Sequence, residues 1–574
     1  MWLVVVDTTQ IQPYIFGSNR LRENIGASYL VDVATRDWAF QAVEKVAPGK
    51  NNIESGNKLI EDTQEDQRDN ARIENGLDAE VLYAGGANFV VLFRDKDKAR
   101  DFQTHLSWRA LEEAPGLQLI IAQQDMEWDQ HVLSNKLDDA FRTLAKQKRN
   151  RVWSAPLLGL SVTASCGSTG LPATDMVEGI GSDPGYLASD EIQAKVNAAW
   201  PADTSAANQR LQEVINLQKA TGSVEYKYPY RFEDLGATAG EYSHIAVVHA
   251  DGNGMGQRIR DIGDECTTVD KNREFVLKLR KFSIKVEDAA KGALNAVLGR
   301  LVKRIIDDED GGKVIVHRLS QHLSIRIKLA HKDSDYFIPF RPIVFGGDDV
   351  TFVCDGRLGL ALAAEYLQEF EQRTAGLGKN NGRLTACAGV AIVKNHYPFA
   401  RAYALAVDLT RSAKDYRTEL VSATSFGTKP VSIGSCLDWH FALSGLSSSI
   451  KQIRDREYET NNGSLTLRPV TLNANPLQRY RSWRVVWKGI KAFQKEEWAE
   501  RRNKIKALRD ALREGPEAVE HFRTAFINNR GPLPSVWSEM ESWPLTGWQE
   551  RRCGYFDAIE LVDWFVPLED PEIA

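Results

Sequence analysis

Short apolar runs that end at an acidic residue occur in both halves of this chain. The run Trp2–Val6 is rich in β-branched residues and ends at Asp7. The run Ile245–Ala250 has the same character and ends at Asp251. Runs of this length and composition predict buried strands. We therefore expect two strands that each present a carboxylate at their carboxyl end.

Two longer segments have an apolar run on each side of a glycine pair. They are Glu80–Phe93, EVLYAGGANFVVLF, and Arg341–Cys354, RPIVFGGDDVTFVC. Two β-rich runs around a glycine turn predict a β-hairpin. Gly346 and Gly347 can adopt the positive φ of a tight turn and leave space for a ligand.

The elements around these strands have the same order in both halves. Apolar residues at helical spacing and further apolar runs predict helices at 20–47, up to about 111, 272–306, 357–375 and 398–417, and strands at 117–123 and 384–393. The order β-α-β-β-α-β is typical of the ferredoxin-like fold. The strand-end carboxylate precedes the glycine pair by 78 residues in the first half and by 95 in the second, which indicates an internal repeat.

The pattern divides the chain into four parts of an α+β protein. We predict a ferredoxin-like domain at 1–165, a linker with helices at 166–240, a second ferredoxin-like domain at 241–430 and a mainly helical domain at 431–574. Acidic side chains dominate residues 50–80, which favours a solvated loop.

Candidate chemistry is concentrated in the second half. Asp251 ends one strand, and Asp348 and Asp349 occupy the tip of the neighbouring hairpin. Three converging carboxylates predict a two-metal site for Mg²⁺ or Mn²⁺ and nucleotidyl transfer. The alternative is a solvated acidic turn. Aligning the glycine pairs places Ala87 and Asn88 at the carboxylate positions of the first half, which we expect not to hold metal.

The strand that ends at Asp251 continues into the glycine-rich sequence ADGNGMG. Glycines at 252, 254 and 256 precede a predicted helix at 257–262. A strand, a glycine-rich turn and a helix start present backbone N–H groups to phosphates. We therefore expect Gly252 and Gly254 to bind a nucleotide.

Composition excludes several classes of protein. The chain has 574 residues, 43% hydrophobic and 26% charged, with a net charge of −6. We expect no membrane span, no signal peptide and no global attraction to nucleic acid. The six cysteines are scattered without a CxxC pair, which argues against a disulfide framework and against a zinc ribbon. This pattern favours a reducing, cytoplasmic location.

The C-terminal part offers one basic segment. Residues 476–513 hold twelve Lys or Arg against four Asp or Glu, with Trp483, Trp487 and Trp498 between them. A surface for RNA or a partner subunit is one interpretation. We favour a charged helical domain that packs its tryptophans inward. The cluster KQKRNR at 146–151 is a weaker case of the same kind.

Four stretches resemble the large polymerase–cyclase subunit of type III CRISPR effector complexes. They are Ile11–Asp32, Phe232–Gly256, the hairpin at 341–354, and Cys387–Lys414. That family has two palm domains, of which the second carries a GGDD hairpin. The fourth stretch is also similar to diguanylate cyclases of the GGDEF type.

The resemblance implies an enzyme that converts ATP into cyclic oligoadenylates in antiviral defence. Its metal-binding and catalytic carboxylates match Asp251, Asp348 and Asp349. Its other nucleotide-binding positions match Lys414 at the triphosphate, Gly346 and Gly347 under the nucleotide, and Asn253 and Met255 in the phosphate loop.

The chain also departs from this family. Many members begin with an HD-type nuclease domain, and this sequence contains no His-Asp dipeptide, so we expect no DNA cleavage by this chain. It also lacks the cysteine-rich zinc module that many members carry. The resemblance implies RNA and the subunits of an RNA-guided complex as partners, but a stand-alone enzyme stays open, as do the oligomeric state, base specificity and ring size. A GTP-using cyclic dinucleotide synthase and a non-catalytic scaffold are the alternatives. The duplicated domain and the GGDD ending disfavour the first, and the three carboxylates disfavour the second.

Overall fold

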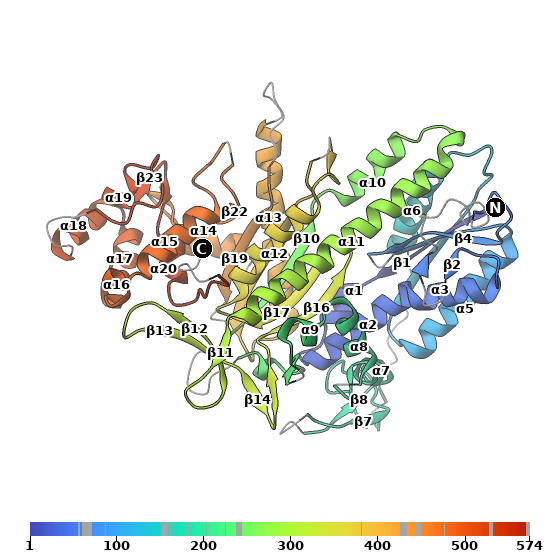
Figure 1. Ribbon diagram of the computed structural model, residues 1–574, viewed down its shortest axis with the longest axis horizontal. Coiled ribbons are helices and arrows are strands. Elements are labelled where there is room, and N and C mark those ends of the chain that lie inside the picture. Colours follow the sequence, from blue (N-terminus) through green and yellow to red (C-terminus); the bar gives the residue numbers. More distant parts are fainter. Residues whose placement is uncertain are drawn as a thin grey trace.

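The computed structural model describes most of the chain. The described residues are 1–54, 58–59, 72–86, 88–150, 159–160, 162–180, 184–202, 204–223, 225–236, 244–379, 382–424, 433–442, 449–475, 477–526 and 532–569. Two sheet-and-helix domains and a helical C-terminal part follow one another along the long axis (Figure 1). Among the described residues, no helix combines the length and the apolar character that crossing a membrane requires.

The first domain is built on a four-stranded antiparallel sheet. Its spatial order is β4 (Ala79–Gly85), β5 (Asn88–Phe93), β1 (Trp2–Thr9) and β6 (Gln118–Asp125). This is the ferredoxin-like order, so the predicted α+β class is confirmed. The helices of this domain are α1 (Ile11–Phe16), α2 (Leu21–Thr35), α3 (Asp37–Val46), α5 (Lys96–Glu113) and α6 (Leu133–Asn150).

The second domain repeats this sheet and extends it. The spatial order is β16 (Phe340–Gly346), β17 (Asp349–Asp355), β10 (His244–Gly252), β18 (Ala386–Lys394), β19 (Cys436–Ala442) and β22 (Val470–Thr471). Its helices are α10 (Met255–Asp264), α11 (Asn272–Lys303), α12 (Gly359–Arg373) and α13 (Phe399–Thr424). Because β19 and β22 continue the sheet, it extends beyond the boundary predicted at 430; the four predicted domain ranges otherwise stay predictions.

The two domains share their hydrophobic cores. One core joins the face of the first sheet under α6 to the face of the second sheet under α11 and α12. The other core joins the face under α3 and α5 to the face under α13. The helix α2 also packs against β16 of the second domain, and α11 packs against β4 of the first. Each domain therefore places a helix on the edge strand of the other, which fixes the two hairpins relative to each other.

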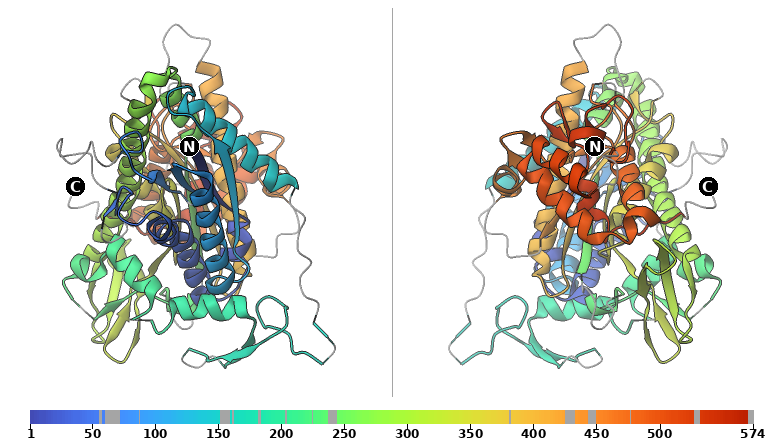
Figure 2. Two further views of the ribbon diagram at one scale, coloured as in Figure 1. Left: turned by 90° about the vertical axis from the view of Figure 1, so that its right-hand side faces the viewer. Right: turned by 90° about the vertical axis from the view of Figure 1, so that its left-hand side faces the viewer.

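The segment before the second domain contains more than loops. Its helices are α7 (Asp190–Ala199), α8 (Ala206–Val214) and α9 (Leu217–Thr221), in agreement with the predicted linker helices. The hairpin of β7 (Asp175–Val177) and β8 (Tyr186–Ala188) projects from one side of the molecule (Figure 2). Most of the predicted acidic loop at 50–80 lies outside the described residues. Its described part contains β2 (Ile53–Glu54) and β3 (Lys58–Leu59).

Five short strands between α11 and β16 were not expected from the sequence. They are β11 (Ile305–Asp307), β12 (Lys313–Arg318), β13 (Ser324–Lys328), β14 (Ala330–Lys332) and β15 (Asp335–Phe337). The last of them pairs with β9 (Tyr226–Lys227) from the linker. Charged residues interrupt the apolar positions in these strands, which weakens the pattern that identifies a strand.

The C-terminal part is mainly helical and includes a small four-stranded sheet. Its elements are α14 (Ile450–Glu457), β20 (Glu459–Thr460), β21 (Gly463–Ser464), α15 (Trp483–Phe493), α16 (Glu496–Ala499), α17 (Arg502–Glu514), α18 (Pro516–Phe526), α19 (Trp543–Thr546), β23 (Trp548–Gln549), β24 (Arg552–Cys553) and α20 (Phe556–Leu561). Trp483 packs against Trp439 and Phe565, and Trp498 packs against Phe493. The inward packing of these tryptophans agrees with the interpretation favoured for the basic segment.

Candidate functional site

The three predicted carboxylates lie on neighbouring strands at one end of the second sheet. Asp251 near the end of β10 pairs directly with Asp349 at the start of β17. Gly346 pairs with Asp349 across the hairpin, so Gly347 and Asp348 form a two-residue turn. Gly347 has a φ of 64°, the left-handed conformation that such turns favour. The structure thus places Asp251, Asp348 and Asp349 at neighbouring strand ends, and their roles stay predictions.

The carboxylate of Asp348 packs over Gly252, and this contact explains why a glycine stands there. A Cβ atom on Gly252 would lie 2.7 Å from Asp348 Oδ2 and 2.6 Å from the Met255 methyl carbon. The Gly252 N–H also donates to the Asp348 carbonyl at 3.2 Å. A side chain at position 252 would therefore displace the turn that carries Asp348.

Burial and mutual repulsion raise the pKa of both hairpin carboxyl groups. The pKa of Asp348 rises to about 7 because of burial and of the charges of Asp251 and Asp349. The pKa of Asp349 also rises to about 7, through burial and the charge of Asp251. Half of the Asp349 side chain is exposed, yet its Oδ1 is buried without a hydrogen-bond partner. These carboxylates need a further positive charge to be ionised together.

One positive charge comes from Lys414 on α13. Its Nζ lies 2.5 Å from Asp251 Oδ2 and donates to the Gly252 carbonyl at 3.2 Å. The close approach of α13 to the sheet depends on Gly389, where a Cβ atom would lie 2.2 Å from the Ala406 carbonyl oxygen. Thr410, one turn before Lys414, donates its hydroxyl to the carbonyl of a β10 residue at 2.9 Å. These contacts hold the lysine at the carboxylates.

His249 is a member of the site that the sequence left unassigned. Its Nδ1 lies 3.1 Å from Thr351 Oγ1 and 3.3 Å from Asp349 Oδ1. Burial lowers the pKa of His249 to about 4, so the imidazole is neutral at pH 7. The sequence did contain a signal, because residues 249 and 251 of one strand face the same side of a sheet. His249 therefore lies beside Asp349 Oδ1 without adding charge.

Some hydrogen-bond donors of the glycine-rich turn after Asp251 already have partners within the protein. The Asn253 N–H donates to the Thr385 carbonyl at 2.8 Å, and its side-chain amide donates to Thr385 Oγ1 at 3.0 Å. These donors anchor the turn to β18. Gly254 is the N-cap of α10, with a φ of 71° and no side chain to cap the helix. The first amides of α10 are thus the groups of this turn that suit a phosphate. The predicted roles of Asn253, Gly254 and Met255 in nucleotide binding stay predictions.

The donor atoms suit a hard divalent cation. Carboxylates of Asp251, Asp348 and Asp349 with a neighbouring backbone carbonyl are the oxygen ligands that Mg²⁺ and Mn²⁺ prefer. In the described part of the chain, however, no three His, Cys, Asp or Glu side chains are gathered closely enough to hold a metal as they stand. Asp251 is instead paired with Lys414 at 2.5 Å, and like charges on the three carboxylates repel one another. Metal binding by these three residues stays a prediction.

The first domain retains half of the site. Asn88 pairs with Asp7 as Asp349 pairs with Asp251. Lys148 Nζ lies 2.6 Å from Asp7 Oδ2 and donates to the following carbonyl at 3.0 Å, which reproduces the contacts of Lys414. Sequence reasoning placed Lys148 only in a basic cluster. Similar spacings from the fourth strand to each lysine were the signal it missed. Ala87, predicted opposite Asp348, lies outside the described residues.

The two hairpin turns meet at the domain interface. A Cβ atom on Gly347 would lie 3.3 Å from Gly86 Cα, so the two glycine turns are in contact. A cavity of about 170 Å³ extends from Asp348 and Asp349 along β16. Its other walls come from α1, α2, α8, α11 and the turn at Gly86. The carboxylates therefore line a space that both domains enclose.

The second ferredoxin-like domain thus combines acidic residues at paired strand ends, a glycine hairpin and a lysine on α13, the helix after β18. Residues 244–420 match the Cas10/Cmr2 second palm domain family. This match confirms the resemblance that the sequence predicts for this part of the chain. A search of curated proteins found no match.

Solved structures of Csm1–Csm4 cassettes are similar to the chain at low identity. One is in complex with cA4, with 12% identity, a TM-score of 0.46, and coverage of 98% of this chain and 68% of the other. Another is in complex with pppApApA, with 12% identity, a TM-score of 0.47 and coverage of 98% and 68%. A third, in complex with one ATP, has 12% identity, a TM-score of 0.46 and coverage of 98% and 70%.

Proposed function

We propose that this protein is a nucleotidyltransferase that joins ATP molecules into cyclic oligoadenylates. The observation that supports this most is the set formed by Asp251, Asp348, Asp349 and Lys414 at the interface of two palm domains. The palm family of residues 244–420 agrees with it. ATP is the proposed substrate, and Mg²⁺ or Mn²⁺ the proposed cofactor.

Each residue has a defined task in this proposal. The carboxylates of Asp251, Asp348 and Asp349 would hold the divalent ions, which supply charge neutralisation and lower the pKa of the attacking ribose hydroxyl. Because lysine is a mobile point charge, the Lys414 ammonium would turn from Asp251 toward the oxygens of the triphosphate. Gly346 and Gly347 would let the nucleotide lie directly on the turn, and the backbone N–H groups at the start of α10 would donate hydrogen bonds to its phosphate oxygens.

The first palm domain would hold the second nucleotide without metal. Asp7 and Lys148 preserve the ion pair of the active copy, whereas Asn88 replaces a carboxylate. A lysine can bind phosphate oxygens there, but one carboxylate leaves too few ligands for two metal ions. We propose other subunits of an RNA-guided complex and RNA as partners on the basis of the family alone.

The direct test incubates the purified chain with each labelled nucleoside triphosphate and Mg²⁺ or Mn²⁺, with and without RNA. Products are separated by liquid chromatography and identified by mass. The proposal expects consumption of ATP, release of pyrophosphate and cyclic adenylate products. Cyclic products from GTP alone would favour the dinucleotide synthase. No consumption of any triphosphate under either condition would contradict enzymatic function.

A further inference from the structure

Arg341 on β16 and Glu80 on β4 occupy equivalent positions in the two domains. Each lies five residues before the first glycine of its hairpin, Gly346 or Gly85, and each edge strand has a register shift just after this position. Both side chains are buried, with exposed fractions of 1% and 0%. The internal repeat therefore places opposite charges at matching buried positions.

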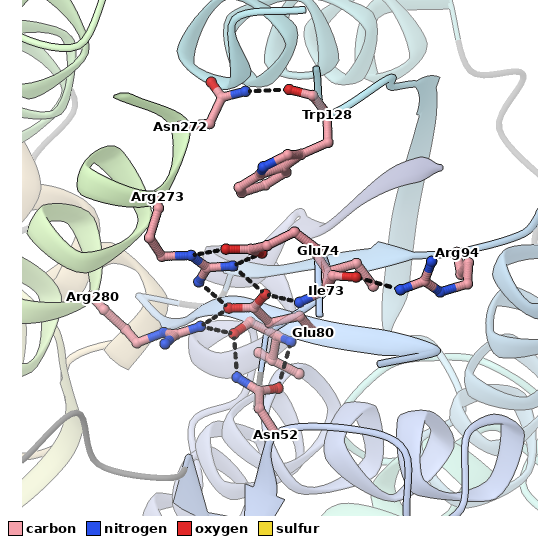
Figure 3. A network of polar contacts seen from close by, with 10 residues as sticks. Asn52, Ile73, Glu74, Glu80, Arg94, Trp128, Asn272, Arg273 and Arg280 are labelled. Carbon is pink, nitrogen blue, oxygen red and sulfur yellow. Dashed lines mark hydrogen bonds and ion pairs between the residues drawn. The ribbon is translucent and has the colours of Figure 1, made fainter. Parts of the chain in front are cut away.

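The charge of Glu80 is balanced by the helix that reaches it from the other domain. Arg273 on α11 lies 2.6 Å from Glu80 Oε1 and also contacts Glu74, and Arg280 lies 2.8 Å from the same Glu80 oxygen (Figure 3). Burial alone would raise the pKa of Glu80, but these arginines lower it. The carboxylate thus has every partner that a buried charge requires.

Arg341 has no comparable partner in the described part of the chain. Two of its guanidinium nitrogens, Nε and Nη1, are buried without a hydrogen bond. The rings of Tyr228 and Tyr230 lie 5.4 and 4.6 Å from its Cζ. Aromatic faces stabilise a guanidinium but accept none of its five hydrogen bonds. A buried cation of this kind favours an anion from outside the protein.

The cavity that reaches the carboxylates is the route for such an anion. Arg341 lines it, together with apolar side chains that include Ile25 and Leu211. The other cations of its wall already have carboxylate partners. Arg36 and Lys291 pair with Glu287, and Arg210 pairs with Asp32. One uncompensated positive charge therefore lies in a partly apolar space.

From these observations we propose that Arg341 binds a phosphodiester of an adenine oligonucleotide that extends from the carboxylates into this cavity. The inference rests on the proposed function, because it assumes that nucleotides enter at Asp348 and Asp349. A phosphodiester carries a single negative charge and presents two oxygens to a planar guanidinium, which matches one unpaired arginine. Arg341 lies five positions before Gly346 on an extended strand, a distance of about 16 Å, so the ligand is longer than the phosphates held at the turn.

The test measures binding of the dinucleotide ApA in EDTA, where the carboxylates hold no metal and no turnover occurs. Adenosine, which lacks the phosphodiester, is the ligand control. We expect wild type to bind ApA at least tenfold more tightly than adenosine, and Arg341→Met to lose that difference. Arg341→Lys should keep part of it. Arg481→Met removes another buried arginine that stacks on a tyrosine, outside the cavity, and should bind ApA like wild type.

A second variant covers the case in which Arg341→Met fails to fold. Val214→Trp fills the cavity from α8 without changing Arg341 and should weaken ApA in the same way. Equal affinity of wild type for ApA and adenosine, or unchanged ApA binding in a folded Arg341→Met, would overturn the proposal. Neither result depends on ATP conversion, so failure of this inference is distinguishable from failure of the proposed function.

Discussion

Replacement of Gly346 by alanine places a methyl group where the account puts the nucleotide. In the protein itself the added Cβ meets no atom within 4 Å. The backbone of Gly346 also does not adopt a positive φ. Alanine is therefore compatible with the backbone of β16. Because alanine restricts the unfolded chain more than glycine, we expect the free energy of unfolding to stay unchanged or rise by up to about 1 kcal/mol.

The effect on nucleotide binding should have the opposite sign. An extra methyl group in an occupied space costs about 1–3 kcal/mol. We therefore expect the Kd for ATP with Mn²⁺ to increase by about 5- to 150-fold. Calorimetric titration gives this Kd, and urea unfolding monitored by circular dichroism gives the stability of the same preparation.

Gly299→Ala is the matched control for this variant. Gly299 lies on α11, and a Cβ there also meets no atom within 4 Å. The same substitution away from the carboxylates should leave the Kd for ATP at its wild-type value. If both variants bind ATP as tightly as wild type, the nucleotide does not lie on the hairpin turn.

Three further predictions concern lysine, glycine and histidine positions. Lys414→Ala should slow pyrophosphate release by about 10²-fold or more, since it removes the cation at Asp251. Lys148→Ala should slow pyrophosphate release less, and equal losses in the two variants would contradict the division of roles between the two domains. Gly389→Ala should lower the free energy of unfolding by about 1–3 kcal/mol, because the added Cβ collides with α13; unchanged urea unfolding would refute this packing. Burial and neighbouring arginines lower the pKa of His440 to about 3. Only the unfolded histidine then gains a proton below about pH 6.5, so stability falls by about 2 kcal/mol from pH 7 to pH 5. His440→Gln should lack this loss, and a variant as pH-sensitive as wild type would argue against it.

The sequence is sufficient for the parts of the fold in which local pattern and glycine chemistry agree. Both hairpins have continuous β-rich runs and glycine pairs, and the structure contains them where the pattern predicts. The three carboxylates follow from the same elements, because directly paired strand ends must lie close together.

Other features depend on packing that local pattern does not encode. The pairing of Lys148 with Asp7 depends on how α6 packs on its sheet, and only the spacing from the preceding strand points to the residue. The contact of Arg341 with the linker tyrosines arises only when the edge strand of the second domain packs against the linker. The strand β19 was missed because it lies beyond α13, the last helix of the repeat. Each of these contacts joins segments far apart in the chain.

The most direct test of the central claim compares two variants in conversion of labelled ATP with Mn²⁺. The double variant Asp348→Ala/Asp349→Ala removes the proposed metal ligands, and Asn88→Ala changes the equivalent position of the first domain. The account predicts that the double variant loses at least about 10²–10³-fold in the rate of pyrophosphate release, with an unchanged circular dichroism spectrum, while Asn88→Ala forms cyclic products at nearly the wild-type rate. A double variant that releases pyrophosphate as fast as wild type would contradict the assignment of these carboxylates as the active site.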